Sequence, residues 1–165
     1  MNKQLRLYLG LISSVAAYYM THEGAHWLCA LFMGIYKQMN FMGLGIQIDV
    51  FAERMTPAQM GIFCLAGPLA TTAAAWMLIA SANRITANPS PVFKACTYYI
   101  TLVMLFCDPL YLSILCGFFG GGDMNGISLL APEALVRIVF AGIFLVHGIL
   151  FVKAVLPKYK LSFEN

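Results

Sequence analysis

The chain has 165 residues, of which 61% are hydrophobic and only 10% are charged. Ordinary soluble domains are roughly half apolar and about a quarter charged, so this composition excludes a typical water-soluble protein. The net charge of +3 is small and spread along the chain, which excludes a basic face for nucleic acid. Five cysteines stand singly within apolar runs and predict neither a disulfide framework nor a cysteine zinc site. The length fits one transmembrane domain over residues 1–165.

Four apolar stretches predict membrane-spanning helices, at about 7–35, 58–82, 95–119 and 133–156. Each has about twenty residues or more, enough to cross a hydrocarbon core of roughly 30 Å. The first stretch follows basic residues, as in a secretory signal, but it is too long and lacks a small-residue cleavage site, so we expect an uncleaved span. The expected fold class is therefore an all-α integral membrane protein with about four transmembrane helices.

The three connections between these stretches differ in character. Residues 37–57 contain an alternation of Ile46, Ile48 and Val50 that predicts a short β-hairpin at the membrane surface. Residues 81–94 are rich in Asn, Pro and Ser and predict a loop. Residues 117–132 are glycine-rich and apolar, and such a segment can re-enter the protein because irregular backbone is tolerated where it lines a cavity.

The distribution of basic residues predicts a multi-pass protein of the cell membrane with both termini in the cytoplasm. Three basic residues, Lys37, Arg54 and Arg137, fall on the side of the first and third connections. The others fall on the side of the termini: Lys3, Arg6, Arg84, Lys94, Lys153, Lys158 and Lys160. Cytoplasmic segments carry the excess of Lys and Arg, which gives this orientation.

The first span contains the motif H-E-x-x-H, formed by His22, Glu23 and His26. A helix places the two histidines about 40° apart on one face, with the glutamate beside them. At this spacing two imidazoles can hold one Zn²⁺ while the carboxylate takes a proton from water. A carboxylate inside an apolar span costs a few kcal/mol, so it is seldom there without a function. The alternative is that these side chains only form hydrogen bonds to neighbouring helices.

A catalytic zinc site normally has three protein ligands, so one more is needed. Two aspartates are candidates, Asp108 within the third span and Asp123 in the glycine-rich segment. His147 stands alone in the fourth span and is more typical of an interhelical hydrogen bond. With a rise of about 1.5 Å per residue, the two motif histidines lie about 19 and 13 Å deep and Asp108 about 15 Å deep. Straight helices thus favour Asp108, and Asp123 fits only if its segment re-enters.

Gly67 and Pro68 lie at a similar depth in the second span. A Gly-Pro pair can kink a helix and free backbone carbonyls. On its own it is also typical of ordinary close packing between membrane helices. Beside the H-E-x-x-H motif, we interpret this pair as part of a substrate groove.

In their order and spacing, these pieces resemble the site-2 protease family of intramembrane zinc metalloproteases. That family has H-E-x-x-H on one membrane helix, then a surface β-hairpin, a helix with a Gly-Pro motif usually ending in Asn, and an Asp-Gly segment that supplies the third ligand. The resemblance covers residues 19–127. "HEGAH" matches fully, whereas Thr71 stands where Asn is usual, and neither "CDPL" nor "GDMNG" is the usual Leu-Asp-Gly.

The resemblance implies Asp123 as the third zinc ligand, with Asp108 as a supporting acid or alternative ligand, and it adds Thr71 to the substrate groove. It also implies a hairpin on the cytoplasmic side, opposite to the orientation that the basic residues predict. The orientation therefore stays open at this point.

The expected function is that of a zinc metalloendopeptidase that hydrolyses a peptide bond in or next to a membrane-spanning substrate. One Zn²⁺ would be held by His22, His26 and Asp123, with Glu23 as the catalytic base. The expected partners are a membrane-protein or peptide substrate, the lipid bilayer and a regulatory membrane protein, and not nucleic acid. The alternatives are a non-proteolytic protein that binds a divalent metal for structure or transport, and an inactive protease-like adaptor.

Overall fold

The computed structural model describes residues 2–43 and 45–164, which form a mostly helical molecule with one small sheet. Its elements, in chain order, are α1 (Lys3–Phe32), β1 (Tyr36–Met42), β2 (Gly45–Val50), η1 (Ala52–Arg54), α2 (Pro57–Ala80), α3 (Ala82–Thr86), α4 (Pro91–Leu110), η2 (Tyr111–Leu115), α5 (Cys116–Phe119), α6 (Gly122–Ile127), α7 (Glu133–Leu150), η3 (Phe151–Val155) and α8 (Leu156–Glu164). The segments η2 and η3 are π-helical and continue α4 and α7.

Side-chain caps determine where two of the long helices begin. Thr56 precedes α2, where its hydroxyl accepts from the Gln59 backbone N–H at 3.2 Å and the Gln59 side chain accepts from the Thr56 N–H at 2.9 Å. Ser90 precedes α4 in the same way and accepts from the Phe93 N–H at 3.3 Å. A proline follows each cap at the first helical position, where its missing N–H costs nothing.

Within the described residues, three helical stretches are long and apolar enough to cross a membrane: Pro57–Ala80, Pro91–Phe119 and Glu133–Glu164. They coincide with the second, third and fourth expected spans. The expected first span corresponds to α1, which has 30 residues but is not among the three. The side chains of its H-E-x-x-H motif and its basic start make α1 more polar than the others. Three apolar stretches are thus present, and a fourth span remains a proposal.

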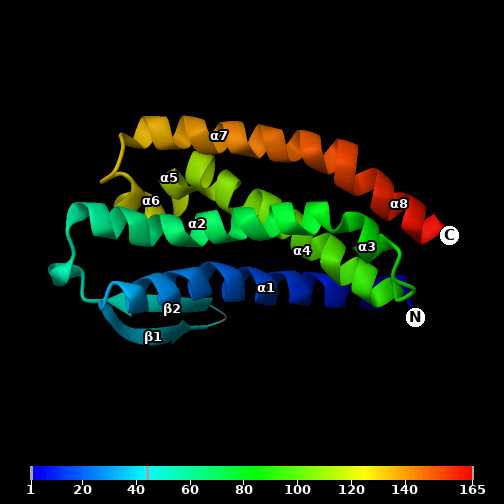
Figure 1. Cartoon of the computed structure of the whole chain (residues 1–165), viewed down its shortest axis with the longest axis horizontal. Helices are drawn as coiled ribbons and strands as arrows, with labels where there is room; N and C mark the ends of the chain where they lie inside the picture. The colour runs from blue at the N-terminus through cyan, green and yellow to red at the C-terminus, as the bar shows by residue number, and fades with distance from the viewer. Residues whose placement is uncertain (1, 44, 165) are drawn as a thin grey trace.

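The helices form a bundle whose long axis runs horizontally in Figure 1. The helices α1, α2 and α4 pack against one another, and α7 covers α4 and η2. The hairpin, α5 and α6 lie at one end of the bundle, while both termini lie at the other. Large apolar side chains cover much of the outside, among them Phe32, Met20 and Ile138. Exposed apolar surface of this extent fits contact with lipid rather than water.

The expected hairpin is confirmed directly after α1. The strands β1 and β2 pair antiparallel, with Met39 opposite Ile48. Ile48 is buried in the main core cluster, whereas Phe41 on β1 is exposed. Because β2 lies against α1, the apolar alternation in its sequence provides the face that packs on the helix.

The glycine-rich segment is more regular than the sequence suggested, because it contains the short helix α6. Gly120 has a φ of +93°, a conformation that favours glycine, and the Tyr111 hydroxyl donates to its carbonyl at 2.8 Å. The chain reverses there, and α6 packs on α2. A Cβ atom at Gly126 would lie 2.3 Å from Cys64 Sγ, so glycine permits this close approach. The connection 81–94 likewise contains a helix, α3.

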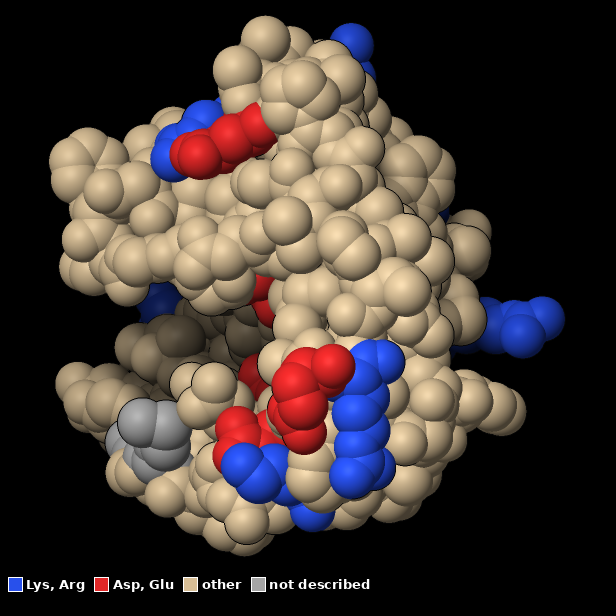
Figure 2. Space-filling model, turned by 90° about the vertical axis from the view of Figure 1, so that its left-hand side faces the viewer, with Lys and Arg blue, Asp and Glu red and all other residues tan. Residues whose placement is uncertain are grey.

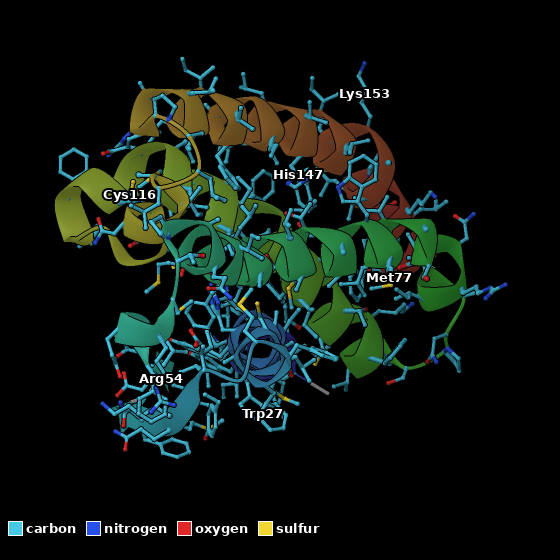
Figure 3. All side chains as sticks on the ribbon, turned by 60° about the vertical axis from the view of Figure 1, so that its left-hand side comes forward. Trp27, Arg54, Met77, Cys116, His147 and Lys153 are labelled. Atoms are coloured by element: carbon cyan, nitrogen blue, oxygen red, sulfur yellow. The ribbon has the colours of Figure 1, made fainter. Side chains whose placement is uncertain are left out.

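His147 joins α7 to the rest of the bundle. Figure 3 shows it pointing from α7 into the bundle, whereas Lys153 points away. Its Nδ1 lies 2.6 Å from the Leu105 carbonyl oxygen, and Trp76 Nε1–H donates to its Nε2 at 3.2 Å. Pro109 stands four residues after Leu105 and has no N–H, so this carbonyl lacks its usual helical partner. His147 therefore makes the interhelical hydrogen bonds expected of it.

Candidate metal centre

The two histidines of the motif lie on one face of α1, and both are buried. Their Nε2 atoms are 3.2 Å apart, and their rings meet nearly edge to face. One helical turn separates them, which is why a four-residue spacing brings both rings to one point.

Asp123 on α6 completes the group. Its Oδ2 lies 3.1 Å from His22 Nε2, and its Oδ1 lies 3.5 Å from His26 Nε2. One ligand atom from each of the three residues lies within 4.8 Å of the others. Ligands bound tetrahedrally to zinc at roughly 2.0–2.2 Å stand about 3.4 Å apart, so these spacings fit a single ion with a fourth position left open.

The other ring nitrogens of the histidines face hydrogen-bond acceptors. His26 Nδ1 lies 2.8 Å from the Phe63 carbonyl oxygen, and His22 Nδ1 lies 3.3 Å from Asp108 Oδ1. An acceptor at Nδ1 holds the proton there and leaves the Nε2 lone pair free for a metal. Both rings therefore have the orientation that a metal ligand requires.

Asp108 is almost fully buried and lies on the Nδ1 side of His22. The Tyr18 hydroxyl donates to it at 2.5 Å, and the Thr71 hydroxyl donates to its other oxygen. The structure thus places Asp123, and not Asp108, at the Nε2 atoms. Asp108 lies at the expected depth but behind the ring, where it supports His22.

Glu23 is half-buried beside the two histidines. It follows His22 directly and precedes His26 by three residues on α1, and the strand β2 packs against this helix. The acid of the motif therefore lies on the helix that carries both histidines and contacts the hairpin.

Gly67 forms the wall of the site on the α2 side. A Cβ atom at this position would lie 2.6 Å from His26 Nε2 and 2.7 Å from His22 Nε2. Pro68 and Thr71 are also buried, so all three predicted groove residues lie inside the molecule. Thr71 contacts Asp108 rather than open surface, and a substrate role for the three residues stays a prediction.

The site opens toward the hairpin end of the bundle. Figure 2 looks onto this end and shows a hollow with acidic atoms in its depth. The Asp123 side chain is 20% exposed, more than either histidine. Burial raises the pKa of the Asp123 carboxyl, but its hydrogen bonds to His22 and His26 outweigh this and lower the pKa to about 2. The carboxylate is therefore available to a cation.

Two contributors to the site were not expected from the sequence, Tyr18 and the Phe63 carbonyl. Tyr18 stands four residues before His22, so helical spacing would have placed it on the same face. The Phe63 contact uses a backbone oxygen, for which the identity of the side chain gives no signal. Thr71, which was predicted to line the groove, donates to Asp108.

No protein-family model matches this sequence, and no curated protein or solved structure is significantly similar to it. Evidence for the function therefore comes from the residues of the site and from their geometry.

Proposed function

We propose that this chain is an intramembrane zinc metalloprotease of the site-2 protease type. One observation carries the proposal: His22, His26 and Asp123 converge with tetrahedral spacing beside Glu23, inside a bundle of apolar helices. Two imidazoles, one carboxylate and an open position are typical of a catalytic rather than a structural zinc site. The full H-E-x-x-H motif favours an active enzyme over an inactive adaptor.

Each residue of the site would have a separate role in peptide-bond hydrolysis. A bound Zn²⁺ supplies a Lewis acid that polarises a carbonyl and makes water more acidic. Glu23 takes the proton from the attacking water and then gives it to the leaving amine. Asp108 and the Phe63 carbonyl hold the imidazoles in place, and Gly67 leaves the space that the ion needs.

The substrate would enter as an extended peptide, because helical hydrogen bonds shield the carbonyls of an intact helix. The hairpin packs against α1, the helix that carries Glu23, and can pair with such a peptide by strand addition. The catalytic residues lie about 9–15 Å along α1 from its Phe32 end, estimated from the helical rise. The bond cleaved would therefore lie in the part of a transmembrane segment nearest the hairpin side.

We further propose that the chain is a multi-pass protein of the cell membrane. In addition to the three apolar stretches, α1 would also cross the membrane, which gives four spans. Its partners would be a membrane-protein or peptide substrate, the surrounding bilayer and a regulatory membrane protein that selects the substrate.

Metal content tests the first step. The full chain, purified in detergent, should contain about one zinc per molecule, and the His22→Ala variant should lose it. His147→Ala is the matched control, because it removes a buried histidine from elsewhere in the bundle and should keep the zinc. Wild-type protein that binds no zinc, or a His22→Ala variant that retains all of it, would overturn the proposal.

Cleavage tests the second step. Membranes from cells expressing the wild type or Glu23→Gln can be compared by mass spectrometry of new protein N-termini. New termini within or beside transmembrane segments should arise with the wild type and with Glu53→Gln, an exposed acid at the same end, and not with Glu23→Gln. If the protein binds zinc but the new termini are identical for the wild type, Glu53→Gln and Glu23→Gln, the non-proteolytic metal-binding alternative is favoured.

A further inference from the structure

A cavity of about 550 Å³ lies at the end of the bundle opposite the metal centre, where both termini meet. Its walls come from the first turns of α1, the first half of α4 and the whole length of α8. The residues that matter here are Lys3, Arg6, Tyr98, Tyr159, Lys160 and Phe163.

The charged side chains that line this cavity are all positive. Lys3, Arg6 and Lys160 line it, and no acidic residue does. In the part of the chain that the structure describes, none of these three cations takes part in an ion pair. The N-terminal end of the long helix α1 adds its own partial positive charge. An anion is therefore the group that this cavity would favour.

Contacts between the three elements hold the cavity open in a defined shape. Lys94 Nζ donates to the Ser162 carbonyl oxygen at 2.5 Å, which ties α4 to α8. The Phe163 ring centroid lies 5.4 Å from Lys94 Nζ and 5.9 Å from the Arg6 guanidinium carbon. Tyr159 is buried, and its hydroxyl donates to Thr97 at 3.3 Å. The basic side chains thus project from a fixed scaffold.

The rest of the cavity is apolar and continues onto the outer surface. Leu7 and Leu156 line it, and both are partly exposed. Leu11 follows Leu7 one turn further along α1 and is 43% exposed, so an apolar strip runs from the cavity along the side of the bundle. A ligand that fits has an anionic head and hydrocarbon chains attached to it.

We propose that this cavity binds the headgroup of an anionic phospholipid. The phosphate would lie among Lys3, Arg6 and Lys160, and the acyl chains would follow Leu7 and Leu11 along α1. Basic pockets between the ends of membrane helices bind such headgroups, and the attraction to each Lys or Arg adds to affinity. The lipid would bridge α1 and α8, which lie on different sides of the cavity.

Lipid binding by the full chain in detergent tests the proposal independently of any protease activity. Native mass spectrometry and thermal melting would compare phosphatidylglycerol, phosphatidylcholine and inorganic phosphate. We expect phosphatidylglycerol to bind at least about tenfold more tightly than phosphatidylcholine and to raise the Tm, and inorganic phosphate to have no effect at millimolar concentration.

The variant Lys3→Gln/Arg6→Gln/Lys160→Gln should bind both lipids equally. Arg84→Gln is the control, because Arg84 is an exposed cation at the same end and does not line the cavity. Circular dichroism would establish that both variants keep their helices, and Lys160→Gln alone provides a milder variant if the triple change fails to fold. Arg84→Gln should keep the selectivity of the wild type. Equal binding of the two lipids by the wild type, unchanged selectivity in the folded Lys3→Gln/Arg6→Gln/Lys160→Gln variant, or equal stabilisation by inorganic phosphate would overturn the proposal.

Discussion

At Gly67, one methyl group determines whether the metal centre has room for its ion. Alanine normally stabilises a helix interior by roughly 1 kcal/mol relative to glycine. At this position, however, the new Cβ would stand within 2.7 Å of both His22 and His26 Nε2 atoms. We therefore expect Gly67→Ala to lose most of its zinc, as measured by elemental analysis of the purified protein.

Gly142→Ala is the control for that prediction, because nothing lies within 4 Å of a Cβ atom there. It should keep its zinc and be at least as stable as the wild type. Full zinc occupancy in Gly67→Ala would contradict this prediction. It would mean that the ion does not lie between the two imidazole rings.

The two aspartates differ in what their removal should do. Asp108 contacts His22 through Nδ1, behind the ring, so Asp108→Asn should weaken zinc affinity by about 10–100-fold and leave one zinc per molecule at saturation. Asp123 faces both Nε2 atoms, so Asp123→Ala should remove a ligand and abolish stoichiometric binding. Competition with a chelator of known affinity measures both effects. If Asp108→Asn abolished stoichiometric binding and Asp123→Ala only weakened it, Asp108 would be the ligand.

The metal-site residues differ in how far the sequence could predict them. His22, Glu23 and His26 follow from helical spacing, because they lie within two turns of one helix. The choice between Asp108 and Asp123 depends on which carboxylate faces the Nε2 atoms of the histidines. Both aspartates are about a hundred residues away in the chain, so local spacing gives no answer. Depth along a straight helix places Asp108 at the right level, but it does not say on which side of the ring the carboxylate lies.

At the scale of the elements, His147 makes the buried polar contacts of α7 with the bundle, while Arg137 of α7 donates to the Ser113 carbonyl oxygen at 3.2 Å. His147→Ala would leave the Leu105 carbonyl and the Trp76 indole N–H without their partners. The Leu105 carbonyl is the buried one of the two, and an unsatisfied buried group costs about 1–3 kcal/mol, so we expect a lower free energy of unfolding, measured by denaturant titration in detergent micelles. Trp76→Phe, which removes one of these hydrogen bonds, should have the smaller effect. Unchanged stability in both would show that the His147 hydrogen bonds do not hold α7 in place.

The elements themselves were predictable to different extents. Long apolar runs and the alternation in 46–50 have strong periodic signals, and the helices and the hairpin are where those signals place them. The helix α6 has only six residues and three glycines around its start, so local propensity opposes it. It forms because the turn at Gly120 and the contact between Gly126 and Cys64 bring it onto α2.

At the scale of the whole molecule, the charges at the two ends of the bundle differ. The hairpin end carries Lys37, Arg54 and Arg137 together with acidic residues, and Glu133 pairs with Arg137 at 2.7 Å. Figure 2 shows blue and red surfaces side by side there. The end with the termini carries most of the basic residues and the proposed lipid cavity. The cytoplasmic leaflet is rich in anionic lipids, and cytoplasmic segments carry the excess of Lys and Arg. The basic residues and the proposed lipid cavity therefore both favour the end with the termini as the cytoplasmic one.

This orientation can be tested with reporters fused to the C-terminus in a bacterial host. We expect green fluorescent protein to fluoresce there and alkaline phosphatase to be inactive, because the phosphatase needs the oxidising exterior to form its disulfides. The same fusions placed after Ala87, in the connection between α3 and α4, should give the same result, since that connection lies at the same end of the bundle. Active phosphatase at both points would show the opposite orientation. The hairpin and the opening of the metal centre would then face the cytoplasm, as the site-2 protease resemblance implies. The proposed lipid cavity would then lie at the outer leaflet, so the outcome also determines which leaflet supplies its ligand.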